Sequence, residues 1–194
     1  MIEENPTTNE LVEAKIFPAD GPLPAVRMLT SPAQVRRAFD ELFEASTNEI
    51  LAFSRPPFPE PPGWVNARVI DAVGRGVKVR ALYLADCVEH AGAESYRPEI
   101  ATYVEAGVDG RVVDELPMKL VVFDRRLALV ALAQPDMLAA NFAPNLLVDD
   151  PGFASAQADA FEYRWPSARP FPSPSPSPSP SDGDGGRSDP FDAD

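Results

Sequence analysis

The side chains best suited to chemistry in this sequence are a lysine and an aspartate in the segment Pro117-Met-Lys-Leu-Val-Val-Phe-Asp124. Lysine occurs only three times in the 194 residues, so Lys119 ahead of an apolar run is unlike ordinary surface composition. Its ammonium group is suited to holding an anionic or polyhydroxyl ligand. The alternative is that Lys119 pairs with a nearby carboxylate and that Asp124 caps the turn after the strand.

The single histidine, His90, and the single cysteine, Cys87, limit other kinds of chemistry. One histidine makes a Ser-His-Asp set implausible, and these two residues are too few ligands for a usual tetrahedral zinc site. We therefore expect no metal and no cofactor. Nothing cationic flanks Cys87 in the sequence, so we interpret it as a buried or inert thiol rather than a redox sensor. We interpret His90 as a loop histidine, and a catalytic role is the alternative.

Charge and hydropathy argue against a protein that binds nucleic acid, is secreted or spans a membrane. The formal net charge is −13, and no cluster of Lys and Arg is present, which argues against a direct nucleic-acid surface. The acidic start Met1-Ile-Glu-Glu4 lacks the features of a signal peptide, and no apolar run is long enough to span a membrane. We expect a cytoplasmic protein that contacts neither nucleic acid nor membrane.

Helical and strand patterns alternate through the first half of the chain. Ser31-Pro-Ala-Gln34 is a capping box that begins a helix over 32–46. The later elements are bounded by proline or glycine, and they are a strand over 49–53, a helix over 64–73, a strand over 77–84, a helix around 100–104 and a strand over 111–113. Strands separated by helices pair in parallel, so we predict an α/β fold with a mixed, mostly parallel sheet flanked by helices.

The second half has a different rhythm. Two apolar runs, 118–123 and 127–133, flank the turn Asp124-Arg-Arg126 and predict an antiparallel hairpin. A further strand is expected over 145–148. Asp150-Pro151 then begins a closing helix that we expect to bury Phe153, Phe161 and Trp165.

Composition sets the expected boundaries of the domain. Residues 1–25 contain several prolines and predict a loose lead-in, whereas residues 26–166 carry the periodic patterns of one α/β domain. Residues 167–194 include a Ser-Pro repeat followed by Asp and Gly, which predicts a disordered tail because little in it can be buried. This tail is interpreted as an unselected extension, or alternatively as a spacer or a ligand for a proline-binding module.

The segment around Lys119 resembles the motif His-x-Lys-x-x-x-x-Asp of the phospholipase D superfamily, in which His attacks phosphorus and Lys holds the phosphate oxygens. Lys119 and Asp124 stand at that spacing, but Pro117 occupies the place of the histidine. The segments beginning at Glu49, Arg75 and Glu115, in this order, are similar to degenerate phospholipase-D-like domains. Such domains occur in TrmB-type sugar-responsive regulators and in actinobacterial regulators with LuxR-type helix-turn-helices.

The resemblance implies a phospholipase-D-like half-domain without the motif nucleophile and without a winged helix or helix-turn-helix of its own. A homodimer, or a heterodimer with a related regulator, is expected because phospholipase-D halves pair face to face. The candidate ligand site contains Lys119 and Asp124. Parallel sheets bind ligands beyond the carboxyl ends of their strands, which adds Arg55, Asp86 and His90.

Three hypotheses for function follow. The first is a non-catalytic sensor and dimerisation module that binds a small polar or anionic ligand. The second is a phosphodiesterase-type enzyme with an atypical nucleophile, which Pro117 argues against because phosphohistidine chemistry requires an imidazole. The third is a regulator fragment without a function of its own.

Overall fold

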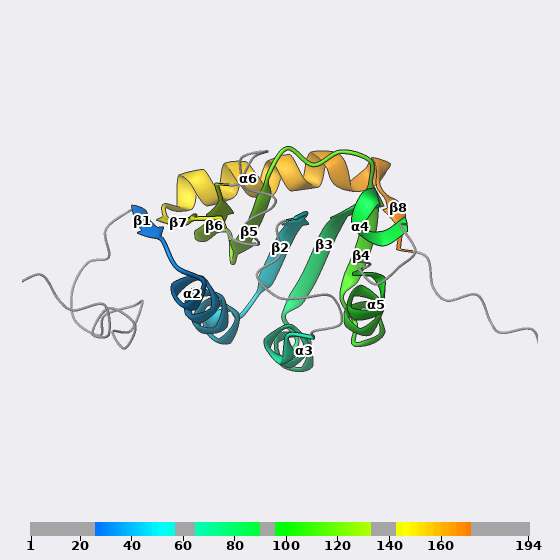
Figure 1. Cartoon of the computed structure of the whole chain (residues 1–194), viewed down its shortest axis with the longest axis horizontal. Helices are drawn as coiled ribbons and strands as arrows, with labels where there is room; N and C mark the ends of the chain where they lie inside the picture. Colours follow the sequence, from blue (N-terminus) through cyan, green and yellow to red (C-terminus); the bar gives the residue numbers. More distant parts are fainter. Residues whose placement is uncertain (1–25, 57–64, 90–95, 133–142, 172–194) are drawn as a thin grey trace, which may run out of the picture.

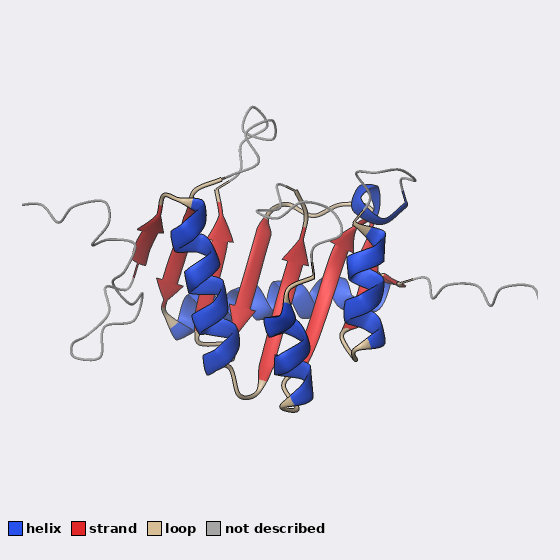
Figure 2. Cartoon of the chain, turned by 60° about the horizontal axis from the view of Figure 1, so that its bottom comes forward, coloured by secondary structure: helices blue, strands red, loops and turns tan. Residues whose placement is uncertain are grey.

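The computed structural model describes residues 26–56, 65–89, 96–132 and 143–171, and within them eight strands form one sheet. Helices α2, α3 and α5 cover one face of this sheet, and α6 crosses the other face (Figures 1 and 2). The strands are β1 (Val26–Leu29), β2 (Glu49–Ser54), β3 (Lys78–Leu84), β4 (Asp109–Val113), β5 (Lys119–Phe123), β6 (Leu127–Ala131), β7 (Asn145–Asp149) and β8 (Arg169–Pro170). The helices are α2 (Pro32–Ala45), α3 (Ala67–Gly74), α4 (Ala85–Glu89), α5 (Arg97–Glu105), α6 (Pro151–Arg164) and the 3₁₀ turn η2 (Trp165–Ser167).

The sheet has the order β1-β7-β6-β5-β2-β3-β4-β8 and is mixed, as predicted, but it is mostly antiparallel. Only the pairs β2–β3 and β3–β4 are parallel, and each of these connections contains a helix. The remaining pairs are antiparallel. β5, β6 and β7 are successive neighbours, β5 also pairs with β2, and β1 and β8 are the outermost strands. The mixed α/β sheet was therefore predicted correctly, including the antiparallel β5–β6 hairpin, but the prediction that the sheet is mostly parallel was wrong.

Local signals place the helix ends. The Ser31 hydroxyl caps α2 by accepting a hydrogen bond from the Gln34 amide, and the side chain of Gln34 accepts one from the Thr30 amide. In this capping box the side chain of Gln34 thus bonds the amide of Thr30, the residue before the cap. Gly76 and Gly107 follow α3 and α5 with φ of +88° and +112°, a conformation that side chains other than glycine rarely adopt.

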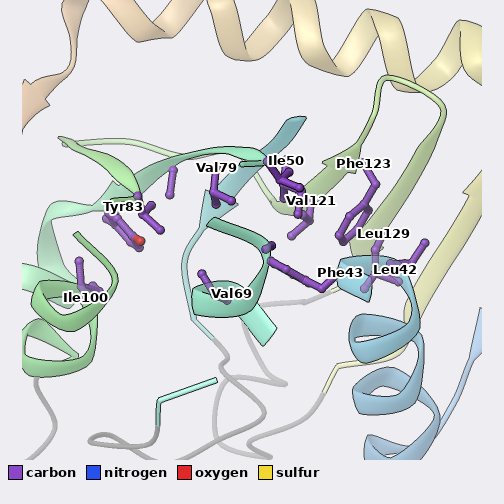
Figure 3. Packing of buried hydrophobic residues seen from close by; sticks show 14 of the residues in the cluster. Leu42, Phe43, Ile50, Val69, Val79, Tyr83, Ile100, Val121, Phe123 and Leu129 are labelled. Atoms are coloured by element: carbon purple, nitrogen blue, oxygen red, sulfur yellow. The ribbon is translucent and has the colours of Figure 1, made fainter. Parts of the chain in front are cut away.

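Two hydrophobic clusters hold the layers together. The first fills the space between the sheet and α2, α3 and α5, and Figure 3 shows Phe43 of α2 and Val69 of α3 facing Val121 and Phe123 of β5. The second lies between the sheet and α6 and is centred on Phe161, which is fully buried and stacks on Trp165. The two clusters use alternate residues of the central strands, as the two-residue period of a strand requires.

An ion-pair network joins α6 to the sheet at the edge where β2 and β3 begin. Arg80 of β3 bonds Glu162 of α6, and its guanidinium also lies over the rings of Phe161 and Trp165. Arg125 bridges Glu49 at 2.6 Å and Glu162 at 3.3 Å. The hydrogen bond to Arg80 holds the pKa of Glu162 below its usual range.

Several elements differ from the prediction. The strands β1 and β8 and the short helix α4 were not expected, and Phe153 is 37% exposed instead of buried. Beyond the expected domain end at residue 166, β8 pairs with β4 and the side chain of Phe171 is buried. The expected lead-in of residues 1–25 and the tail from residue 172 onward lie outside the described residues.

Candidate functional site

The carboxyl ends of β2 and β3 and the amino end of β5 meet at one edge of the sheet. β3 runs parallel to β2, and β5 runs antiparallel to it, with Phe53 beside Leu120. Arg55 follows β2, α4 follows β3, and Lys119 begins β5. The structure thus brings three of the predicted site residues, Arg55, Asp86 and Lys119, to the same edge. His90 lies outside the described residues.

Lys119 is one of four strand residues that lie side by side across this edge. Ala131 of β6 is its register partner, and Asn145 of β7 is the partner of Ala131. On the other side, continuing the β2–β5 register beyond Phe53 and Leu120 places Ser54 next to Lys119. Burial lowers the pKa of Lys119 to about 8, and this lowering is partly opposed by the neighbouring Cys87.

Arg55 positions the start of β5. Its guanidinium donates a hydrogen bond of 2.7 Å to the carbonyl of Leu116 and a longer one, 3.4 Å, to the carbonyl of Pro117. Both acceptors lie just before Lys119 in the chain. The side chain therefore holds the segment in which the family motif would carry its histidine.

Cys87 of α4 is buried close to these cations. Burial raises the pKa of its thiol to about 11, and Asp86 raises it further, while Arg55 and Lys119 act in the opposite direction. The raised pKa keeps the thiol protonated at neutral pH, in agreement with the inert thiol expected from the sequence. The sequence interpretation missed its cationic neighbours, because they come from strands far away along the chain.

Asp124 lies at the other edge of the sheet, since β5 separates it from Lys119. It sits in the tight turn of the β5–β6 hairpin with φ of 50°, followed by Arg125 with 51°. Its carboxylate accepts hydrogen bonds from the amides of Thr47, Asn48 and Glu49 at 2.8–2.9 Å. The structure therefore does not bring Asp124 into the cluster with Lys119, and Asp124 holds the α2–β2 connection instead of capping its own turn.

A cavity of about 450 Å³ extends from Lys119 beneath the helices, within the size range of small-molecule sites. Its floor is the sheet face of the first hydrophobic cluster, where Ala52 and Ala81 are register partners on the central strands. Two adjacent alanines leave room that larger side chains would fill. Apolar wall residues come from three helices and the strand ends, namely Val35, Phe39, Phe43, Val69, Ile100 and Val108.

The sequence interpretation missed the polar residues that line this cavity. Glu99 of α5 is 5% exposed, and Tyr103 lies one helical turn further along. The Tyr103 hydroxyl accepts a hydrogen bond from the Asn66 amide, which ties α5 to the start of α3. The signal was present, because Glu99 and Tyr103 have the four-residue spacing of a common helix face and the helix was assigned through Ile100 and Tyr103. The other charged residues that line the cavity are Arg36, Asp40 and Arg68.

Within the described ranges, no group of three or more His, Cys, Asp or Glu side chains is placed to hold a metal ion. Among the helices in that same part of the chain, none is long and apolar enough to cross a bilayer.

The mixed sheet, the hairpin that begins at Lys119 and the closing helix α6 define a phospholipase-D-like α/β fold. The chain is similar to TrmBL2, described as an archaeal chromatin protein with a novel mode of DNA binding, with a TM-score of 0.57 and 20% identity. It is also similar to Nuc, a phospholipase D family member from Salmonella typhimurium, with a TM-score of 0.56 and 18% identity. NucT from Helicobacter pylori has a TM-score of 0.53 and 14% identity.

The extent of these similarities differs. The match covers 84% of this chain but only 57% of TrmBL2, so this chain corresponds to about half of that protein. It covers 76% and 75% of this chain and 98% of Nuc and of NucT, so both correspond to the α/β domain alone. No family model matches the sequence, and no curated protein matches it.

Proposed function

We propose that this chain is a non-catalytic, phospholipase-D-like sensor module that binds a small anionic ligand at Lys119 and works through a second protein chain. The observation that carries this proposal is the position of Lys119. Lys119 lines a cavity of small-molecule size, and the segment before it carries Pro117, whose carbonyl accepts a hydrogen bond from Arg55. A cation remains where the family motif holds an anion, while proline cannot attack phosphorus.

The absence of catalysis is tested with bis-p-nitrophenyl phosphate as the substrate. We expect the wild-type protein to release nitrophenol no faster than a heat-denatured sample, and the His90→Ala and Lys119→Met variants to match it. Turnover by the wild type that either substitution lowers would contradict the proposal. In that case the chain would be a phosphodiesterase with an atypical nucleophile.

Binding of an anion is tested separately by isothermal titration calorimetry with acetate and inorganic phosphate. Lys119→Met should abolish the heat of binding, and Lys78→Met is the matched control because Lys78 is an exposed lysine at the start of β3. If Lys119→Met still binds both anions, Lys119 is not part of the anion site.

The second chain is either another copy of this protein or a related regulator that carries a DNA-binding module. The net charge of −13 supports a partner as the DNA-contacting component, since a duplex repels an acidic surface. TrmBL2 is described as binding DNA, and this chain corresponds to just over half of it. Light scattering after gel filtration should give twice the monomer mass, or co-purification should yield a regulator chain. A strictly monomeric protein that captures no such chain would refute this part.

A further inference from the structure

The lining of the cavity is informative about the kind of ligand it accepts. Its floor is formed by Ile50, Ala52, Val79, Ala81 and Val121, and its helical walls are also mainly apolar. A sugar would bury several hydroxyl groups against these surfaces, and each hydroxyl without a partner would cost affinity. The cavity therefore fits an apolar molecular body better than a polyhydroxyl one.

The row of strand residues that contains Lys119 supplies the polar groups that the head group of a ligand would meet. Lys119 is flanked by Ser54 and Ala131, and Asn145 follows at the next strand. The Asn145 amide already donates to the carbonyl of Ala143, which fixes its orientation. Ser54 and Lys119 both line the cavity and supply a hydroxyl and an ammonium group side by side. A carboxylate accepts hydrogen bonds from both kinds of donor.

The apolar floor limits the number of negative charges on the ligand. The charged residues that line the cavity besides Lys119 are of both signs, Arg36, Asp40, Arg68 and Glu99, and of these only Glu99 is buried. A second carboxylate on the apolar body would lie over the floor, whose side chains supply no hydrogen-bond donor in place of water. One negative charge is thus favoured over two.

We propose that the cavity binds a monocarboxylate with an apolar body of medium length, its carboxylate at Lys119 and Ser54 and its body over Ala52 and Ala81. This inference rests on the proposed function, because it assumes that Lys119 receives the anion. It adds the class of ligand, an amphipathic acid in place of a sugar or an inorganic anion.

Calorimetric titration of the full-length protein with acetate, butyrate, hexanoate and octanoate tests the role of the apolar body without any substitution. Affinity should rise roughly fourfold with each methylene group that enters the cavity. Octan-1-ol and the dicarboxylate suberate should each bind at least tenfold more weakly than octanoate, and glucose should not compete with it. Octanoate that binds no more tightly than acetate, or glucose that displaces it, would overturn the inference.

Two variants separate the head group from the body. Lys119→Met should weaken octanoate at least tenfold and leave octan-1-ol unchanged, whereas Ala52→Val should weaken octanoate and leave acetate unchanged. Acetate binding through Lys119 combined with a flat chain-length series would overturn this inference and leave the proposed function standing. If neither acetate nor octanoate binds, both fail. If octanoate binds equally to wild type and Lys119→Met, recognition of the carboxylate by Lys119 is refuted.

Discussion

Replacing Lys119 with methionine should stabilise the protein at neutral pH, although the residue is the centre of the proposed site. The pKa of Lys119 is lowered from 10.5 to about 8 by burial. At roughly 1.4 kcal/mol per tenfold change in proton affinity, this corresponds to about 3 kcal/mol of destabilisation while the side chain is charged. The side chain keeps partial contact with solvent, which screens its charge, so we expect a gain of about 1–3 kcal/mol in Lys119→Met.

The free energy of unfolding should change with pH in a direction set by the lowered pKa of Lys119. Between pH 8 and pH 10.5 the folded protein has lost the Lys119 proton, whereas the unfolded chain still binds it. The free energy of unfolding of the wild type therefore gains a contribution as pH rises through this window. Cys87 acts in the opposite direction, because its pKa is raised to about 11 and its thiol ionises more readily when unfolded. Because the thiol is present in both proteins, the difference between wild type and Lys119→Met reports the lysine together with its coupling to Cys87.

The assay is urea denaturation followed by circular dichroism at pH 7, 8, 9 and 10.5. Lys119→Met should be more stable at pH 7, and its advantage should shrink toward pH 10.5. Lys78→Met should change stability little at every pH, since Lys78 is exposed. A less stable Lys119→Met at pH 7, or an advantage that stays constant with pH, would refute the reasoning about burial.

Three further predictions concern the surroundings of the site. Asp124→Ala should cost about 1–3 kcal/mol in urea denaturation, because three amide donors, one of them partly buried, lose a charged acceptor. Burial would raise the pKa of Asp124, but these hydrogen bonds outweigh it and lower the pKa, so the wild type should lose this stabilisation only as pH falls below the ordinary value of 3.8. Cys87 should react with iodoacetamide at pH 8 much more slowly in the folded protein than in urea, and equal rates would contradict its burial. Glu162→Gln should destabilise the protein by about 1 kcal/mol and make it less sensitive to salt, because Arg80 and Arg125 lose a charged partner; an unchanged salt dependence in urea titrations would argue against the network.

Local chemistry made much of the fold predictable. The cap at Ser31, the glycines after α3 and α5 and the Asp-Arg-Arg turn act within a few residues, so the sequence alone identifies the elements they bound. The hairpin that begins near Lys119 follows from two apolar runs separated by three residues. Arg55 and Asp86 were also expected at one edge, because residues that follow parallel strands collect there, whereas Lys119 and Asp124 were added through the family resemblance.

Other features depend on contacts between distant segments. The pairing of β5 beside β2, which puts Lys119 next to Ser54, required both faces of the sheet to be packed at once. The register of β2 with β3 places Ala52 beside Ala81 and so opens the cavity. β8 was missed because two residues carry no strand periodicity, and only their pairing with β4 makes them a strand.

The sequence by itself determined most of the helices and strands, the place of the motif lysine and the absence of a histidine at the motif position before it. Only the tertiary structure decided that Asp124 binds the α2–β2 connection and that Lys119 lines an apolar cavity. The physical reason is that capping, turns and periodicity are satisfied by neighbours in the chain. Burial, strand register and the pKa of a buried lysine depend instead on residues brought together from the whole domain.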